Sequence, residues 1–83
     1  MPRDGTGNKK VAFEIGIGKY LTPMELEVAK RLAMGEKNSE IATELDISVK
    51  TVDTHRGHVL EKTSTRNNVE LARWALRCEL VTL

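Results

Sequence analysis

The chain has 83 residues, 40% of them hydrophobic, and a net charge of +1, so it forms one small domain of marginal stability. Only Phe13, Tyr20 and Trp74 are aromatic, which makes the core mainly aliphatic. The near-neutral charge excludes a uniformly basic nucleic-acid binder, so any basic footprint must be local. The single cysteine, Cys78, excludes an internal disulfide, and no apolar run reaches the length of a membrane span. We expect a cytoplasmic protein without membrane contact.

Residues 1–10 combine glycine, proline and basic residues without periodicity, which is typical of a mobile arm. Residues 11–17 then alternate apolar with other residues, the period of a half-buried strand. The sequence shows no second strand-like stretch, so this segment is expected to lie on the helices, to pair with another subunit, or to stay loose. Gly16 and Gly18 are expected to form a flexible hinge. We therefore assign residues 1–20 to an N-terminal arm, flexible and then extended.

The compact domain is expected to span residues 21–83, and its first helix has a strong start signal. Thr22 can cap the helix, Pro23 fits the first helical position, and Glu25 can complete a capping box. Gly35 is expected to end the helix in a left-handed conformation. The residues expected to be buried are Leu26, Val28, Ala29, Leu32 and Ala33.

Two further helices follow in close succession. The second is expected from Asn38 or Ser39 to about Asp46, with Ile41, Ala42 and Leu45 on its buried side. A tight turn at Asp46 and Ile47 comes next, and Ser48 is placed to cap a third helix. Two short helices joined by so tight a turn predict a helix-turn-helix.

The third helix has a narrow apolar side and a broad polar one. At about 100° per residue, Val52 and Val59 point in nearly the same direction and are expected to face the core. The outer arc then holds Lys50, Thr51, Asp53, Thr54, Gly57, His58 and Glu61. Gly57 costs roughly 1 kcal/mol relative to alanine, which makes sense if another surface approaches the backbone there. The arc is either a plain solvated face or a DNA-binding face, whose helix N-terminus offers N–H groups to phosphate.

A fourth helix is expected from Asn67 to about Glu79, with Glu70 completing a second capping box. Two apolar stripes run along it, although one stripe is enough to dock a helix. One stripe holds Val69, Ala72, Leu76 and Leu80, and the other holds Leu71, Trp74 and Cys78. Trp74 either caps the thin core or joins a two-fold interface. We predict the interface, formed by the second stripe.

Catalytic and metal chemistry is not expected. His55 and His58 point roughly 60° apart on a helix. Cys78 lies on another helix, and a zinc site normally has four ligands at recognisable spacing. No nucleophile with a base and an orienting group is apparent, and no glycine-rich loop follows a predicted strand. We therefore expect no enzymatic activity, no cofactor and no metal.

Several segments resemble the LuxR-type domain of bacterial transcription regulators, also called the GerE or NarL type. These are LTPMELEV at 21–28, Gly35, Asn38, EIA at 40–42, and the motif L-x-ISVKTVxxH from Leu45 to His55. Arg66-Asn67 and Glu70-Leu71 resemble the start of its fourth helix. The resemblance covers about residues 20–83, and the long motif at this distance from LTPxE is specific.

The resemblance implies an all-α, four-helix helix-turn-helix domain that binds double-stranded DNA. Its third helix, about residues 49–63, would lie in the major groove, and its fourth would mediate dimerisation. By position, Lys50 and Thr51 resemble phosphate anchors, and His55 resembles a helix-edge residue with a phosphate contact. The base-reading positions correspond to Asp53, Thr54, Gly57 and His58. The predicted DNA-binding set also includes Asn38, Lys62 and Arg66.

Two departures from the family pattern concern the recognition helix. Lys62 is followed by Thr63, Ser64 and Thr65, where the family usually has Leu-Gly-Val, so the end of the third helix is expected to fray. Asp53 repels phosphate but can accept a hydrogen bond from cytosine N4.

Two functions follow from these patterns. The first is a sequence-specific, DNA-binding transcription regulator that acts as a homodimer. The alternative is a helix-turn-helix-derived interaction module that binds another regulator or RNA polymerase. The length leaves no room for a receiver or ligand-sensing domain, so we expect a stand-alone regulator or one domain of a longer product.

Overall fold

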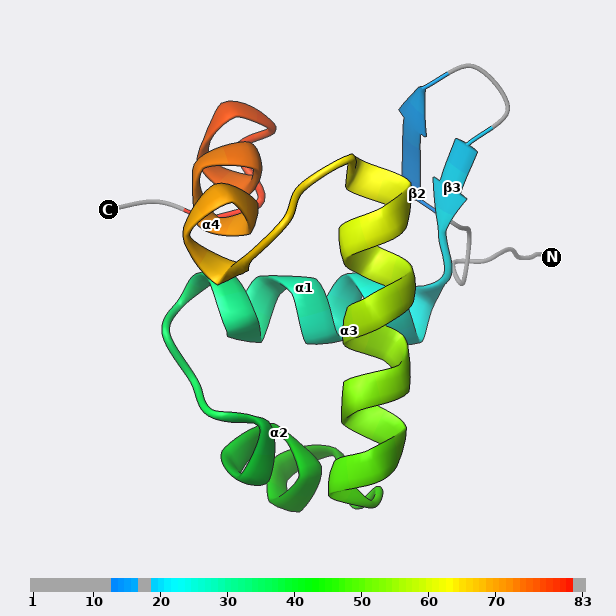
Figure 1. Ribbon diagram of the computed structural model, residues 1–83, viewed down its shortest axis with the longest axis vertical. Coiled ribbons are helices and arrows are strands. Elements are labelled where there is room, and N and C mark those ends of the chain that lie inside the picture. The colour runs from blue at the N-terminus through cyan, green and yellow to red at the C-terminus, as the bar shows by residue number, and fades with distance from the viewer. Residues whose placement is uncertain (1–12, 17–18, 82–83) are drawn as a thin grey trace, which may run out of the picture.

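The computed structural model describes residues 13–16 and 19–81, so the predicted arm at residues 1–10 lies outside it. Two short strands precede four helices (Figure 1): β2 (Phe13–Gly16), β3 (Lys19–Leu21), α1 (Pro23–Ala33), α2 (Asn38–Leu45), α3 (Val49–Thr63) and α4 (Asn68–Arg77). The predicted four-helix, helix-turn-helix class is confirmed. Among the described residues, no helix combines the length and apolarity that crossing a membrane requires.

The start of α1 is fixed by the predicted capping box. The Thr22 hydroxyl accepts a hydrogen bond from the Glu25 N–H (3.1 Å), and the Glu25 carboxylate accepts one from the Thr22 N–H (2.9 Å). Two N–H groups that the first turn leaves without helical partners are thereby satisfied. At the other end, Gly35 has a φ of +93°, the positive value predicted for the residue that ends this helix.

The core forms around α1, against which both α3 and α4 pack, while α2 packs against α3. Figure 1 shows α1 crossing behind α3, with α4 and α2 at opposite ends of α3. Among the residues whose burial the structure describes, eleven buried hydrophobic residues make up this core: Leu21, Val28, Ala29, Leu32, Ile41, Ala42, Val52, Val59, Leu71, Trp74 and Ala75. Apart from Trp74 they are aliphatic, as the composition predicts.

The strand before α1 has a partner in its own chain, because β2 pairs with β3 in an antiparallel hairpin. The expectation that no partner stretch exists is therefore wrong. The partner is only three residues long, and Lys19 and Tyr20 are exposed, so it has no visible alternation. Leu21 is fully buried and ties β3 to the core. Gly16 is not a hinge but a member of β2, opposite Lys19, and Gly18 lies outside the described residues.

The end of α3 differs from the expected fraying, since the helix is continuous to Thr63. The Thr63 hydroxyl donates to the Val59 carbonyl oxygen (2.8 Å) and lies 2.8 Å from the Thr65 hydroxyl. A threonine at this apolar position is tolerated because its hydroxyl finds partners inside the helix and the following loop. Ser64 then ends the helix with a φ of 57°.

The start of α4 confirms half of the predicted capping box. The Asn67 side chain accepts a hydrogen bond from the Glu70 N–H (2.9 Å). The Glu70 carboxylate, however, accepts from the Arg66 N–H (2.9 Å), one residue earlier than predicted. The helix ends at Arg77, two residues before the expected Glu79.

Candidate DNA interface

The turn between α2 and α3 is set by three residues. Asp46 adopts the left-handed conformation (φ 57°, ψ 48°), which short polar side chains tolerate better than most. The Ile47 N–H donates back to the Ala42 carbonyl oxygen (3.0 Å), which closes the end of α2. The Ser48 hydroxyl then accepts from the Thr51 N–H (3.0 Å) and starts α3. The predicted helix-turn-helix is thus built from local hydrogen bonds.

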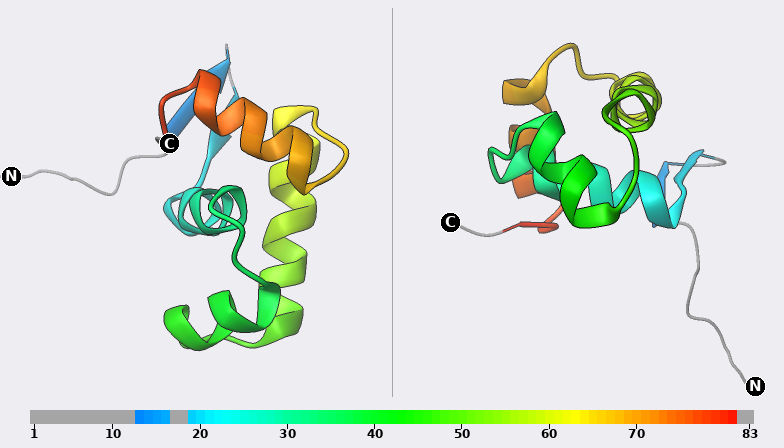
Figure 2. Two further views of the ribbon diagram at one scale, coloured as in Figure 1. Left: turned by 90° about the vertical axis from the view of Figure 1, so that its left-hand side faces the viewer. Right: turned by 90° about the horizontal axis from the view of Figure 1, so that it is seen from below.

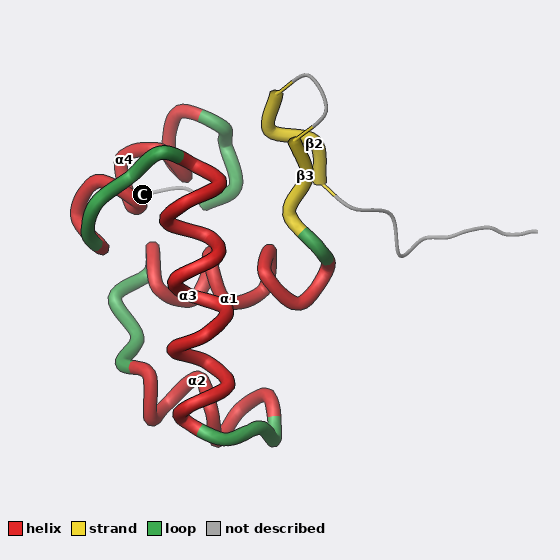
Figure 3. Tube along the Cα trace, turned by 45° about the vertical axis from the view of Figure 1, so that its right-hand side comes forward, coloured by secondary structure: helices red, strands yellow, loops and turns green. Residues whose placement is uncertain are grey.

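One side of α3 packs on the core and the other faces away. Val52 and Val59 are both fully buried, as predicted from their spacing. Figure 2 shows α3 nearly end-on at the edge of the molecule, and Figure 3 shows it in front of α1 with α2 at its N-terminal end. The helix therefore presents its polar side along its length.

The polar side matches the predicted outer arc. Its exposed members are Lys50, Asp53, Thr54, Gly57, His58 and Glu61, whereas Thr51 and His55 are half-buried. A Cβ atom added at Gly57 would meet nothing within 4 Å, so the packing of the chain does not require glycine here. The Thr54 hydroxyl donates to the Lys50 carbonyl oxygen (3.1 Å), which holds the side chain against the helix. The polar side of α3 is consequently open at Gly57, and the Thr54 side chain lies close to the helix backbone.

Lys62 faces α1 instead of standing free. Its ammonium lies 2.7 Å from Oε1 of the buried Glu25, and Nδ1 of His58 lies 3.5 Å from Oε2 of the same carboxylate. Burial acts to raise the pKa of Glu25, but hydrogen bonds from Lys62 and from the Thr22 N–H outweigh it and bring the pKa below 4.5. Glu25 is therefore a carboxylate that links α1 to α3.

Arg66 lies in the loop between α3 and α4, beyond the end of α3 opposite to Lys50. Its guanidinium donates twice to the Glu70 carboxylate, at 2.7 and 3.1 Å. This pairing lowers the pKa of Glu70 and raises that of Arg66. Asn38, the first residue of α2, is half-buried. Apart from Asn38, the predicted DNA-binding residues thus lie along α3 and in the loop that follows it, and they do not gather at one point.

Two of the three residues in the α4 stripe predicted to form a dimer interface lie in the core of the single chain. Leu71 is fully buried and Trp74 is 8% exposed, and both belong to the core. Trp74 therefore caps the core, which was the alternative reading. Only Cys78 is exposed. Both stripes have helical spacing, so the sequence could not decide which one docks on α1.

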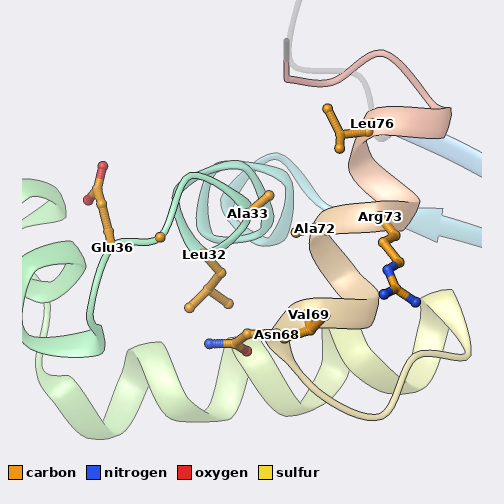
Figure 4. Close-up of a pocket in the computed structure, with 9 residues that line it drawn as sticks. Leu32, Ala33, Glu36, Asn68, Val69, Ala72, Arg73 and Leu76 are labelled. Carbon is orange, nitrogen blue, oxygen red and sulfur yellow. The ribbon is translucent and has the colours of Figure 1, made fainter. Parts of the chain in front are cut away.

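Two residues of the other stripe of α4 face outward, whereas its last residue, Leu80, packs against the core. Val69 is 63% exposed and Leu76 is 36% exposed. With Ala72 they line a groove whose opposite wall includes Leu32 and Ala33 near the C-terminal end of α1. In Figure 4, Ala33 and Ala72 lie between the two helices, with Leu76 above them and Val69 on the first turn of α4. The groove gives α4 an exposed apolar surface that the predicted interface did not include.

Glu25 is the site residue that the sequence did not point to. One oxygen of its carboxylate and one ring nitrogen each from His55 and His58 all lie within 4.8 Å of one another. The sequence identified Glu25 only as a cap, and it precedes His55 by 30 positions. No local spacing could have signalled this cluster, because it depends on how α1 crosses α3.

Comparison with known proteins agrees with this architecture. The profile of the family described as "Bacterial regulatory proteins, luxR family" (GerE) matches residues 19–75. The transcriptional regulatory protein UhpA of Escherichia coli is 45% identical over 65 residues, which are 76% of this chain and 33% of UhpA. The oxygen regulatory protein NreC of Staphylococcus carnosus is 38% identical over 63 residues, 76% of this chain and 29% of NreC. The chain thus spans about a third of the length of these relatives. It belongs to the luxR family of bacterial regulatory proteins and carries the helix-turn-helix DNA-binding domain of that family.

Proposed function

We propose that this domain regulates transcription in the bacterial cytoplasm by binding double-stranded DNA with α3 in the major groove. The observation that carries the proposal is the open polar face of α3, which stands at the edge of the molecule while Val52 and Val59 anchor its other side. A major groove about 12 Å wide admits one α-helix. Exposed Asp53, Thr54, Gly57 and His58 would then face the base edges, with Gly57 allowing the closest approach.

Lys50 and the start of α3 are the proposed phosphate contacts. Lys50 is exposed, and none of the salt bridges among the described residues involves it. Lys62 and Arg66, by contrast, are paired with Glu25 and Glu70. Of the lysines and arginines in the predicted DNA-binding set, only Lys50 is therefore outside an ion pair, and each phosphate contact contributes about 0.9 to the slope of log affinity against log salt. We expect binding of modest affinity with a shallow salt dependence.

We further propose that two copies pair through the outward stripe of α4, so that two α3 helices reach successive major grooves. Val69 and Leu76 supply exposed apolar surface for such a contact. A symmetric dimer presents its recognition helices about 34–36 Å apart, one turn of DNA. The proposed interface does not include Leu71 and Trp74, because both side chains are buried in the core.

The proposal is tested by selecting bound duplexes from random DNA and measuring their affinities by fluorescence anisotropy at two salt concentrations. Lys50→Ala is expected to weaken binding to every duplex and to reduce the salt slope by about 0.9. Thr54→Ala is expected to change the preferred bases instead. Arg77→Ala removes the same charge from the far end of α4 and serves as the control, with the salt slope unchanged. If Lys50→Ala and Thr54→Ala both match the wild type, α3 does not dock as proposed.

The second candidate is a protein-interaction module that binds another regulator or RNA polymerase. The pairing of Lys62 and Arg66 with carboxylates favours it, as does the apolar groove beside Val69 and Leu76. This function predicts no salt-dependent binding to any duplex. It also predicts binding to purified RNA polymerase that weakens when Val69 is replaced by aspartate. Selected duplexes bound in the manner described above would exclude it as the main function.

A further inference from the structure

The cluster of Glu25, His55 and His58 joins the start of α1 to the middle of α3. Glu25 is 4% exposed, His55 is half-buried, and His58 is at the surface. One potential ligand atom from each residue lies within 4.8 Å of the other two. The cluster therefore opens to solvent on the His58 side and has a buried carboxylate as its floor.

We propose that these three side chains bind a divalent transition-metal ion of the zinc type, with the remaining coordination position open to water. Two imidazoles and one carboxylate are ligands that such ions take, and three protein ligands plus water form a recognised zinc arrangement. This inference goes beyond the proposed DNA binding and does not depend on it.

The geometry is close to what an ion requires. Ligand atoms about 2.0–2.2 Å from a tetrahedral zinc ion lie about 3.3–3.5 Å from each other. Nδ1 of His58 and Oε2 of Glu25 are already 3.5 Å apart. Since all three ligand atoms lie within 4.8 Å of one another, no pair must close by more than about 1.5 Å. Rotation of the exposed His58 side chain can supply part of this movement without a change in the backbone.

A second observation comes from His55, whose Nδ1 atom is buried and has no hydrogen-bond partner among the described residues. Buried polar atoms are rarely left in this state because the lost hydration is not replaced. An ion bound to the ring would give this imidazole a polar partner that the described chain does not provide.

The Glu25 carboxylate is also oriented for this role. Its Oε1 accepts hydrogen bonds from the Thr22 N–H (2.9 Å) and from Lys62 (2.7 Å). Its Oε2 is the oxygen that faces His58. Partners of this kind hold a ligating carboxylate in one position. The positive charge of Lys62 opposes a cation, so we expect a weaker site than one built from four protein ligands.

The test is titration of the untagged, full chain with zinc chloride, followed by calorimetry and by NMR of the histidine ring nitrogens. The chain has only two histidines, so each ring signal can be assigned to a member of the cluster. Cys78 is an exposed thiol, and the titrations are therefore done in a Cys78→Ser background. One zinc ion per chain is expected, with both histidine signals shifting together.

Variants separate this site from unspecific binding. His58→Asn removes one ligand from an exposed position, so the fold should persist, and zinc affinity is expected to fall at least tenfold. Asp53→Asn removes an exposed carboxylate from the same helix outside the cluster and should leave affinity unchanged. A dissociation constant weaker than about 1 mM for the wild type overturns the proposal. Equal affinity of His58→Asn and wild type, or a shift of only one histidine signal, does so as well.

Discussion

Replacing Leu71 by alanine tests which side of α4 faces the core. Leu71 is fully buried where α4 packs against α1, whereas Leu76, on the same helix, is 36% exposed in an open groove. The same substitution at Leu76 is therefore a matched control. It removes the same atoms from the same helix and differs mainly in the surroundings of the side chain.

The loss in free energy of unfolding should be about three to four times larger for Leu71→Ala than for Leu76→Ala. Leucine-to-alanine changes at fully buried sites cost about 2.7–5 kcal/mol, because a cavity adds to the lost transfer energy. We expect about 3–4 kcal/mol for Leu71→Ala. At Leu76 no enclosed cavity forms and only part of the side chain was buried, so we expect about 1 kcal/mol. A domain of this size has a total stability of about 4–12 kcal/mol, so Leu71→Ala alone removes a large share.

The assay is denaturation by guanidinium chloride followed by far-ultraviolet circular dichroism, at a low and a high protein concentration. At low concentration the two losses report packing within one chain. A loss at Leu76 equal to or larger than that at Leu71 would show that α4 docks by its other stripe, which contradicts the described core. The proposed α4 dimer gains support if the denaturation midpoint of the wild type rises with protein concentration and that of Leu76→Ala does not.

Three further predictions concern local structure. Gly57→Ala should stabilise the domain by about 0.5–1 kcal/mol in the same denaturation assay, because the added Cβ atom meets no other atom. The same variant should bind DNA more weakly in the anisotropy assay. A loss of stability would contradict the open surface at this position. Thr22→Ala should cost about 1 kcal/mol by breaking the capping box of α1, whereas an unchanged midpoint would show that the box contributes nothing. The pairing with Arg66 holds the pKa of Glu70 in the folded state below 4.5, so it stabilises the fold above pH 4.5, and this contribution is lost as the pH falls through the folded-state pKa. The melting temperature of Glu70→Gln should therefore depend less on pH below pH 4.5 than that of the wild type. Parallel curves of melting temperature against pH would refute the assignment.

The helix boundaries could be predicted because the signals that set them are local. Thr22 with Glu25, Ser48, and Asn67 each lie within three residues of the N–H groups that they satisfy. Such hydrogen bonds form wherever the rest of the chain lies. For the same reason the turn between α2 and α3 could be placed from sequence.

Features that depend on how distant segments meet could not be predicted. The two stripes of α4 are both apolar at helical spacing, and only its packing against α1 selects Leu71 and Trp74 for the core. The β2–β3 pairing was missed because β3 is short and mostly exposed. Glu25 could be identified as a cap, but its contacts with His58 and Lys62 span 33 and 37 positions of the chain.

The Glu25 carboxylate connects the start of α1 directly to the end of α3. It closes the first turn of α1 through the Thr22 N–H and holds Lys62 near the last turn of α3. The start of α1 and the end of α3 are therefore joined by two hydrogen bonds to one oxygen, in addition to the packing of the buried Leu21 beside Thr22. The position of the last turn of the helix that we place in the groove is thus set partly by the first turn of α1, at a distance from every base-facing side chain in the sequence.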